Sequence, residues 1–383
     1  MFETSSLQIS KEAYRHNLKF IKQQIGASVR FCSVVKGNAY GHGIASFVKM
    51  AIEEGVDYFA VYSADEAYQI KQNCDPKIQI MIMGMIGEDA LEWVIKNGIE
   101  FFVFDAVRLD QAIKYAIKLK VKAKIHIEVE TGMNRTGFTL EQLPPIFNLL
   151  HHYQNELQFV GFCTHYAGAE SIVNDFRVQK QIEVFNKAKE MLKEHNLKPQ
   201  YFHSACSAGV MNYPETIGDM VRIGIMQYGF WPNEETLVRF NGRSREGDVT
   251  LKRLITWKSE VMTIKNVLKG DYIGYNTSYQ AYADMKVAIV PVGYAFGYSR
   301  SLSNSGKVLI NGQLAPICGI VNMNALCADI SQIPDAKKGD EVILIGVQGE
   351  NTISVSSFGE MSQQLNYELL TRLPQDIPRI IIK

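Results

Sequence analysis

Residues 31–54 read FCSVVKGNAYGHGIASFVKMAIEE, and this stretch decides the fold. The apolar run Phe31–Val35 is typical of a buried strand, and a glycine-rich turn follows it from Lys36 onward. Ile44–Glu54 then has apolar residues at helical spacing. A strand, a turn and a helix form the repeating unit of an α/β protein, and the same order recurs along residues 1–225.

Seven further strand candidates follow the first one, separated by segments of helical length. The candidates are Tyr58–Tyr62, Ile78–Met83, Glu100–Phe104, Lys122–Val129, Leu157–Thr164, Gln200–His203 and Met220–Ile223. Ala64–Asn73, Ala106–Lys120 and Asp175–Glu194 are the clearest helical segments between them. Eight strand–helix units predict an α/β fold built on an N-terminal (β/α)8 barrel of the TIM type.

The pattern changes after the Trp231-Pro232-Asn233 segment. A polar stretch, Asn241–Asp248, precedes short strand-like runs with little helical periodicity. These runs are Lys286–Pro291, Lys307–Ile310, Ala315–Ile320 and Glu341–Ile345. We therefore expect the barrel to occupy residues 1–238 and a C-terminal mainly-β domain to occupy residues 239–383, with the first ten or so residues free to join the β domain.

Composition narrows the classes of partner. Forty basic residues balance forty acidic ones, so no excess of positive charge indicates nucleic acid or an anionic membrane surface as the main partner, and we expect a small-molecule site and neither of those partners. Residues 1–30 contain no apolar core of signal-peptide length, and no uncharged apolar run could span a bilayer, so we expect a cytoplasmic protein. The six cysteines form no CxxC pair, which suggests neither disulfides nor a metal site.

Polar residues follow several of the predicted strands, at the end where barrel enzymes carry their active groups. Lys36 follows the first strand, Arg135 the fifth and His165 the sixth. A lysine held there can lose solvation, lower its pKa and react with an aldehyde cofactor. Each residue taken alone also has an ordinary structural explanation: Lys36 as a surface lysine, Arg135 as part of an ion pair in a loop, and His165 as a histidine packed in the core. Their joint placement favours an active site.

The seventh and eighth strands end in HSACSAG, from His203, and VRIGI, from Val221. Loops at these positions form the usual phosphate-binding corner of such barrels, because small residues expose backbone N–H groups. We expect Ser207, Gly224 and Ile225 to form a phosphate cup. Ser207 could equally cap a helix, and the two roles are compatible.

Together, VVKGNAYGHG, ETGMNRTGF, THYAG and VRIGI resemble segments of alanine racemases, and the similarity extends in the same order over nearly the whole chain. The resemblance implies pyridoxal 5'-phosphate as cofactor, held covalently by Lys36. It also implies that Tyr40, and Tyr367 in the segment NYELL, contact the cofactor phosphate.

The same resemblance implies a role for each strand-end arginine. Arg135 would contact the phenolic oxygen of the cofactor and lie in the substrate site. Arg222 would face the pyridine nitrogen and form a hydrogen bond with His165, where most pyridoxal enzymes place a carboxylate instead.

C-terminal segments extend the resemblance to the substrate. GYNTSY ends in Tyr279, which would be the second catalytic base opposite Lys36, since racemisation needs a proton-transferring group on each face of the α-carbon. PVGYAFGYSRSLSN places Tyr298 at the substrate entrance, and VNMN places the backbone amide of Met323 at the substrate carboxylate. In this family the tyrosine comes from the other subunit, which implies a homodimer with shared active sites. The implied reaction interconverts L-alanine and D-alanine and supplies D-alanine for peptidoglycan.

Departures from the family pattern leave alternatives open. Asn324 and Phe296 stand where aspartates are usual, which also fits a racemase of broader specificity. Glu128 stands where many members carry a carbamylated lysine, and it could hold Arg135 by a charge-assisted pair. Cys206 replaces the usual asparagine and receives no role. A fold-related pyridoxal decarboxylase and a non-enzymatic cofactor carrier are the competing functions.

Overall fold

The computed structural model describes residues 3–74, 77–243, 250–355 and 366–383. The chain divides into two compact units. The barrel unit comprises Glu12–Gly37 and Val48–Arg253, and the β unit comprises Met1–Lys11, Asn38–Phe47 and Leu254–Lys383. Residue 238, where the sequence suggested a boundary, lies inside helix α10 (Glu234–Arg243) of the barrel unit.

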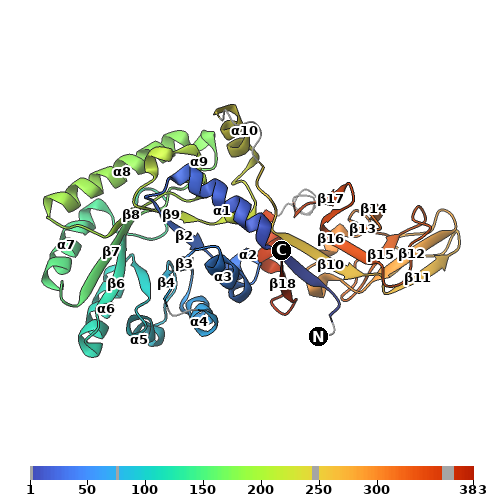
Figure 1. Cartoon of the computed structure of the whole chain (residues 1–383), viewed down its shortest axis with the longest axis horizontal. Coiled ribbons are helices and arrows are strands. Elements are labelled where there is room, and N and C mark those ends of the chain that lie inside the picture. Colours follow the sequence, from blue (N-terminus) through green and yellow to red (C-terminus); the bar gives the residue numbers. More distant parts are fainter. Residues whose placement is uncertain (1–2, 75–76, 244–249, 356–365) are drawn as a thin grey trace. The chain divides into compact units, whose positions relative to one another are not determined.

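Eight parallel strands form the sheet of the barrel unit, in the order β8-β7-β6-β5-β4-β3-β2-β9 (Figure 1). They are β2 (Arg30–Val34), β3 (Tyr58–Val61), β4 (Gln79–Ile82), β5 (Glu100–Val103), β6 (Ala123–Glu128), β7 (Leu157–Cys163), β8 (Tyr201–His203) and β9 (Met220–Ile223). The eight predicted strands are therefore confirmed. Every residue of β3 and β5 is buried, because strands of a parallel barrel are covered on both faces.

The barrel closes between β8 and β9 through hydrogen bonds at both ends of the short strands. The Asp219 N–H donates to the Phe202 carbonyl at 2.9 Å, and the Arg222 N–H donates to the Ala205 carbonyl at 3.0 Å. A bridge between Cys206 and Arg222 continues the pairing past the strand ends. The loops after β8 and β9 are thereby held side by side.

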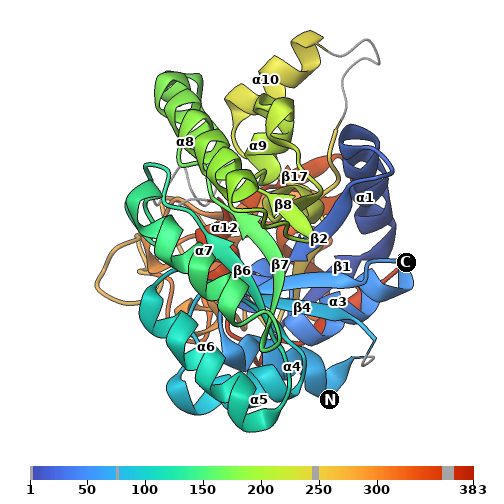
Figure 2. The same ribbon diagram turned by 90° about the vertical axis from the view of Figure 1, so that its left-hand side faces the viewer.

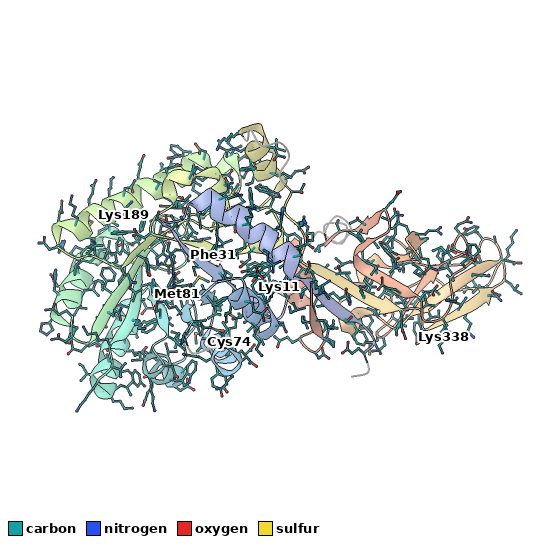
Figure 3. The ribbon with its side chains drawn as sticks, viewed as in Figure 1. Lys11, Phe31, Cys74, Met81, Lys189 and Lys338 are labelled. Carbon is teal, nitrogen blue, oxygen red and sulfur yellow. The ribbon has the colours of Figure 1, made fainter. Side chains whose placement is uncertain are left out.

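Helices cover the outside of the barrel strands, and Figure 2 shows α5, α6, α7 and α8 outside β6 and β7. The helices are α1 (Lys11–Ile25), α3 (Ile44–Glu53), α4 (Ala64–Asn73), α5 (Glu88–Lys96), α6 (Ala106–Leu119), α7 (Leu143–His152), α8 (Asp175–Glu194) and α9 (Ser207–Asn212). The sequence determines their ends locally, as in α6, where the Asp105 side chain accepts from the Arg108 N–H at the N-cap. Figure 3 labels the buried Phe31 and Met81 on the strands and Lys189 on α8.

The β unit consists mainly of strands, as predicted. One sheet has the order β14-β13-β16-β10-β1-β18 with β17 paired to β16, and a second has the order β11-β12-β15. The strands are β1 (Ser6–Ser10), β10 (Ile255–Glu260), β11 (Thr263–Val267), β12 (Met285–Val290), β13 (Lys307–Ile310), β14 (Gln313–Pro316), β15 (Leu326–Asp329), β16 (Glu341–Gln348), β17 (Asn351–Ile353) and β18 (Arg379–Ile382). The predicted run Ala315–Ile320 is strand only up to Pro316.

The N-terminal strand β1 belongs to the β unit because both of its neighbours lie there. It pairs antiparallel with β10 and parallel with β18. Leu7 and Ile9 of β1 and Trp257 of β10 are fully buried, so this strand contributes to the core of the unit. Among the described residues, no helix is both long and apolar enough to cross a membrane.

Candidate active site at the strand ends of the barrel

Lys36 begins a turn of unusual handedness directly after β2. The backbone dihedral φ is positive at Gly37, Asn38, Ala39 and Tyr40, with values of 62°, 55°, 53° and 51°. Because α2 (Lys36–Tyr40) is nevertheless helical, it is one turn of left-handed helix. L-residues other than glycine pay about 1–2 kcal/mol each for this conformation, so surrounding contacts must hold it.

Contacts inside the β unit hold the end of this turn. A Cβ atom on Gly41, where φ is +84°, would lie 1.9 Å from the Leu370 carbonyl oxygen, so only glycine fits. The Arg379 guanidinium donates to the Gly41 carbonyl from Nε at 3.2 Å and from Nη2 at 3.1 Å. The Asn38 side chain accepts from the Ile44 N–H at 2.9 Å. The backbone after Lys36 is therefore fixed by tertiary contacts.

Glu66 on α4 fixes the beginning of the turn within the barrel unit. Its two carboxylate oxygens accept from the Gly37 N–H at 2.7 Å and from the Tyr62 N–H at 2.8 Å. Burial, and then the positive charge of Arg135, lower the pKa of Lys36, and Glu66 opposes that change. Lys36 therefore carries a larger neutral fraction than an exposed lysine does, which is the form that attacks a carbonyl carbon.

Arg135 lies in the exposed loop after β6, and Glu128 ends that strand. Glu128 is buried, and its Oε2 has no hydrogen-bond partner among the described residues. Burial raises the pKa of Glu128, while Thr136 and the charges of Arg135 and Arg222 act in the opposite direction. No ion pair joins Glu128 to Arg135 in the described part of the chain, so their interaction is electrostatic at longer range.

Arg222 on β9 is buried and makes its hydrogen bonds to the ends of β7 and β8. Its Nη2 donates to the Thr164 carbonyl at 2.7 Å, and its Nη1 donates to the His203 carbonyl at 2.9 Å and to His203 Nδ1. Within the described residues no hydrogen bond joins Arg222 to His165, so the structure gives this arginine a different histidine partner from the one the sequence suggested. Burial and the charge of Arg222 lower the pKa of His165 to about 3, so His165 is neutral at physiological pH.

The predicted phosphate cup is brought together at the closing edge of the barrel. Ser207 begins α9, and its hydroxyl oxygen accepts from the Gly224 N–H at 3.2 Å. Gly224 precedes a 3-10 helix that begins at Ile225. The first N–H groups of both helices lack partners within their own helix, which suits an anion.

Tyr279 lies in the β unit, at the end of an exposed loop. Its carbonyl accepts from the Ile273 N–H at 3.0 Å, which closes the loop, and its side chain packs against a buried cluster that includes Ala281, Met285 and Cys318. Burial, and then the charge of Cys318, raise the pKa of Tyr279 above its ordinary value. The hydroxyl is therefore protonated at neutral pH.

The remaining predicted residues of the β unit differ in exposure. Tyr298 is fully buried, and its ring lies 6.2 Å from that of Trp257, between centroids. Met323 is exposed, and its carbonyl accepts from the Ala295 N–H at 3.0 Å. Tyr40 is half-buried on the left-handed turn, and Tyr367 lies on α12 (Asn366–Arg372), with its side chain outside the described residues.

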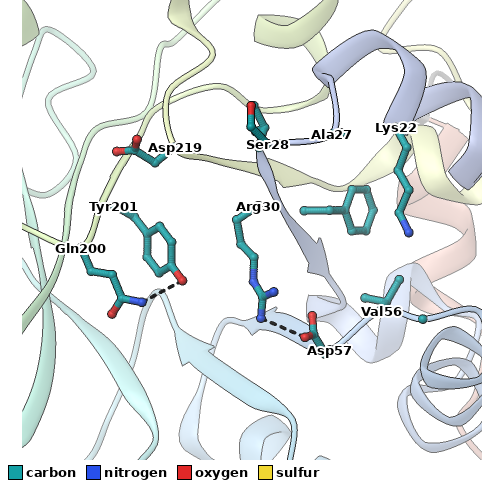
Figure 4. Close-up of a pocket in the computed structure, with 12 residues that line it drawn as sticks. Lys22, Ala27, Ser28, Arg30, Val56, Asp57, Gln200, Tyr201 and Asp219 are labelled. Atoms are coloured by element: carbon teal, nitrogen blue, oxygen red, sulfur yellow. Dashed lines mark hydrogen bonds and ion pairs between the residues drawn. The ribbon is translucent and has the colours of Figure 1, made fainter.

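The structure thus brings together Lys36, Arg135, His165, Arg222 and the phosphate cup within one unit. Sequence reasoning missed Glu66, because an acidic residue in the first turn of a helix is ordinary. His203 ends a strand, as His165 does, but only the structure pairs it with Arg222. The pocket of about 530 Å³ in Figure 4 is not this site, because Arg30, Asp57, Tyr201 and Asp219 line it at the opposite ends of the strands.

A TIM-type barrel with a partly neutral lysine and a candidate anion cup at its strand ends, followed by a β-rich unit, defines a two-unit barrel enzyme. Residues 9–232 match the alanine racemase N-terminal domain, and residues 254–381 match the alanine racemase C-terminal domain. The chain belongs to the alanine racemase family, whose members are isomerases.

The similarity to individual relatives extends over nearly the whole of both chains. The alanine racemase of Leptospira interrogans serovar copenhageni is 32% identical over 379 residues, which are 99% of this chain and 96% of the relative. The crystal structure of Bacillus anthracis alanine racemase with bound L-Ala-P has a TM-score of 0.90 and 30% identity, covering 100% of this chain and 96% of that one. The structure of Bartonella henselae alanine racemase with covalently bound pyridoxal phosphate, at 24% identity, TM-score 0.82 and 99% coverage of both chains, shows a shared fold.

Proposed function

We propose that this chain interconverts L-alanine and D-alanine with pyridoxal 5'-phosphate held by Lys36. One observation carries the proposal: Lys36 is half-buried beside the positive charges of Arg135 and Arg222 at the end of β2, and its pKa is lowered. When bound, the cofactor withdraws electrons from the α-carbon of an amino acid and so acidifies its α-hydrogen. The relatives of known name and structure support the substrate.

The donor set at the strand ends fits this cofactor. Ser207, Gly224 and Ile225 offer a hydroxyl and backbone N–H groups to a phosphate, and we propose Tyr40 and Tyr367 as further phosphate contacts. Arg135 would face the phenolic oxygen. Arg222 would face the pyridine nitrogen, where a guanidinium disfavours protonation and so suppresses side reactions such as transamination.

Two groups would move the proton. Lys36 Nζ would take or deliver it on one face of the α-carbon, and the Tyr279 hydroxyl on the other. The raised pKa of Tyr279 keeps that hydroxyl ready to donate at neutral pH. We propose that a second copy of the chain supplies Tyr279, together with the Met323 amide for the substrate carboxylate and Tyr298 at the entrance, so that the enzyme acts as a homodimer in the cytoplasm and provides D-alanine for peptidoglycan.

A racemase of broader specificity is the second candidate, and one observation favours it. The two uncharged replacements of the usual aspartates lie on two segments that are hydrogen-bonded to each other. The Tyr294 N–H donates to the Asn322 carbonyl, and the Ala295 N–H donates to the Met323 carbonyl, both at 3.0 Å. Phe296 follows the first segment and Asn324 the second. A local loss of negative charge would weaken the exclusion of larger or acidic side chains. Equal rates with alanine, serine and lysine would support this candidate, and turnover of alanine alone would reject it.

The decisive experiment follows α-proton exchange in D2O and circular dichroism together, starting from each alanine enantiomer. We expect the wild type to racemise alanine and Tyr279→Phe to lose exchange far more from one enantiomer than from the other. Tyr275→Phe is the matched control, because Tyr275 lies in the same loop and is 68% exposed. Absence of racemisation by the wild type would reject the function, and release of CO2 from lysine or ornithine would identify a decarboxylase instead.

A further inference from the structure

A line of hydrogen-bonded polar side chains runs through the interior of the barrel. It contains one residue from each of five strands, and each is at most 5% exposed. The members of this line, which we call the relay, are Arg222 (β9), His203 (β8), His126 (β6), Glu100 (β5) and Tyr58 (β3). Buried polar groups at this depth need every partner satisfied, so the direction of each bond can be worked out.

The direction of the relay follows from Arg222, which can only donate. Arg222 Nη1 donates to His203 Nδ1, so the single proton of neutral His203 must be on Nε2. His203 Nε2 lies 2.9 Å from His126 Nδ1, which must therefore accept. The proton of His126 is then on Nε2, which lies 2.9 Å from Glu100 Oε2.

The other end of the relay imposes the same direction. Tyr58 donates its hydroxyl proton to the Oε2 atom of Glu100 that also accepts from His126. An ionised carboxylate accepts only, so it requires donors on both sides. A doubly protonated His126 would put two N–H groups against each other at His203. Both imidazoles are therefore neutral, with the proton on Nε2.

The electrostatic environment agrees with these hydrogen-bond directions and protonation states. Burial would raise the pKa of Glu100, but the hydrogen bond and the electrostatic attraction from His126, together with the hydrogen bond from Tyr58, bring it below its ordinary value, so the group is a carboxylate. Burial, with the charge of Arg222, lowers the pKa of His203 well below its ordinary value, so that imidazole is neutral. Gly161 leaves room for the bond between the imidazoles, since a Cβ there would lie 1.9 Å from His126 Nδ1 and 2.6 Å from His203 Nε2.

We propose that Glu100 is a positioning residue for Arg222: its carboxylate fixes the Nε2–H tautomers of His126 and His203 and so presents His203 Nδ1 as a permanent acceptor for the guanidinium. This proposal rests on the proposed function in one respect, namely that Arg222 faces the cofactor. It assigns a role in the reaction to a side chain at the beginning of β5, on the far side of two imidazoles from the arginine.

The relay orients charge and does not conduct protons to solvent. Its last member, Tyr58, is fully buried and is covered by Arg30, whose Cζ lies 5.6 Å from the ring centroid, and by Tyr201, whose ring centroid lies 6.3 Å away. Arg30 and Tyr201 line the pocket in Figure 4, where Arg30 is paired with Asp57 and Tyr201 with Gln200. The relay therefore ends beneath the lining of this pocket.

The first test reads the tautomers directly. Full-length protein with ¹⁵N-labelled histidine is examined by long-range ¹H–¹⁵N NMR without added substrate, and scalar coupling across the N–H···N bond identifies the His126–His203 pair. We expect both rings to be neutral with the proton on Nε2 throughout the neutral pH range. A protonated ring, or a proton on Nδ1 of either residue, would overturn the proposal whether or not the protein racemises alanine.

The second test separates positioning from mere packing. Glu100→Gln keeps an oxygen that can accept the same two bonds, so we expect unchanged tautomers and kcat/KM within a few fold of wild type. Glu100→Met has similar length and no acceptor, so the tautomers should become mixed. We expect kcat/KM to fall roughly tenfold to a hundredfold, by analogy with the loss found when the hydrogen-bonding partner of a metal-ligating side chain is removed. Tyr201→Phe is the control, since its hydroxyl lies outside the relay.

Three results would overturn the proposal: wild-type tautomers in Glu100→Met, wild-type kcat/KM in that variant, or an equal loss in both Glu100 variants. If Glu100→Met does not fold, the wild-type tautomers and the Gln variant decide. Failure of the proposed function would look different, because the wild type would then not racemise alanine while its histidine tautomers could still be read.

Discussion

Gly161→Ala tests the packing of the relay directly, because the added methyl group would meet both of its imidazoles. The added methyl group would lie 1.9 Å from His126 Nδ1 and 2.6 Å from His203 Nε2, so the imidazoles can make room for it only by breaking the bond between them. The two imidazoles must separate, and two buried nitrogen atoms then lose their partner at about 1–3 kcal/mol each. Overpacking adds about 1–3 kcal/mol. Taking the lower limit of each contribution, we expect a loss of at least about 3 kcal/mol in the free energy of unfolding.

Thermal unfolding followed by circular dichroism measures this loss. For a unit of this size, about 3 kcal/mol corresponds to a decrease in Tm of roughly 6–12 °C. Gly242→Ala on α10 is the control, because a Cβ there meets nothing within 4 Å and alanine favours a helix by about 0.5–1 kcal/mol. A Gly161→Ala protein that melts within about 2 °C of the wild type would refute the steric reasoning, since that shift is no more than about 1 kcal/mol.

Two predictions concern titrating groups. Lys36 has a lowered pKa, so it should react with pyridoxal 5'-phosphate and borohydride at lower pH than other lysines do. We expect the pH midpoint of its labelling to lie below the ordinary lysine value of 10.5. Labelling of Lys36 that increases only at the pH where surface lysines react would contradict this. The pKa of Glu128 is raised, so its stabilising contribution exists at low pH and is lost as the pH rises through the folded-state pKa. Glu128→Gln should therefore gain more Tm over the wild type at about pH 8 than at about pH 4, while turnover falls roughly tenfold if the carboxylate orients Arg135. A difference in Tm between Glu128→Gln and the wild type that does not change with pH would refute the expectation on stability. Unchanged turnover in Glu128→Gln would refute the expectation that this carboxylate orients Arg135.

Hydrophobic periodicity was sufficient to predict the barrel. Helices such as Ala64–Asn73 and Asp175–Glu194 begin and end at the predicted residues, because apolar spacing and polar flanks determine them locally. The sequence allowed the first ten or so residues to join the β domain, but it did not suggest that residues 38–47 belong there. The β unit includes β1 and residues 38–47, and their membership depends on pairing with chain more than 200 residues away.

Strand-end position selected Lys36, Arg135 and His165 as candidates without side-chain geometry, whereas Arg222 was selected through the family resemblance. What it could not show is which polar groups meet. His126 lies in the middle of a strand and Glu100 at the beginning of one, so each reads as an ordinary polar interruption in the sequence. Only the folded sheet, in which β5 and β8 lie on either side of the paired strands β6 and β7, shows that His126 bonds to both Glu100 and His203.

The left-handed turn after Lys36 limits how far the barrel can be treated as an independent module. The residues that fix the end of that turn, Leu370 and Arg379, come from the last part of the chain. A shortened chain ending near residue 253 would retain the lysine and every barrel strand, yet the strained turn would lose the two hydrogen bonds from Arg379 to the Gly41 carbonyl at its end. The turn that follows the lysine is thus completed by residues from the last part of the chain, and an engineered barrel would need a substitute for Arg379 at this point.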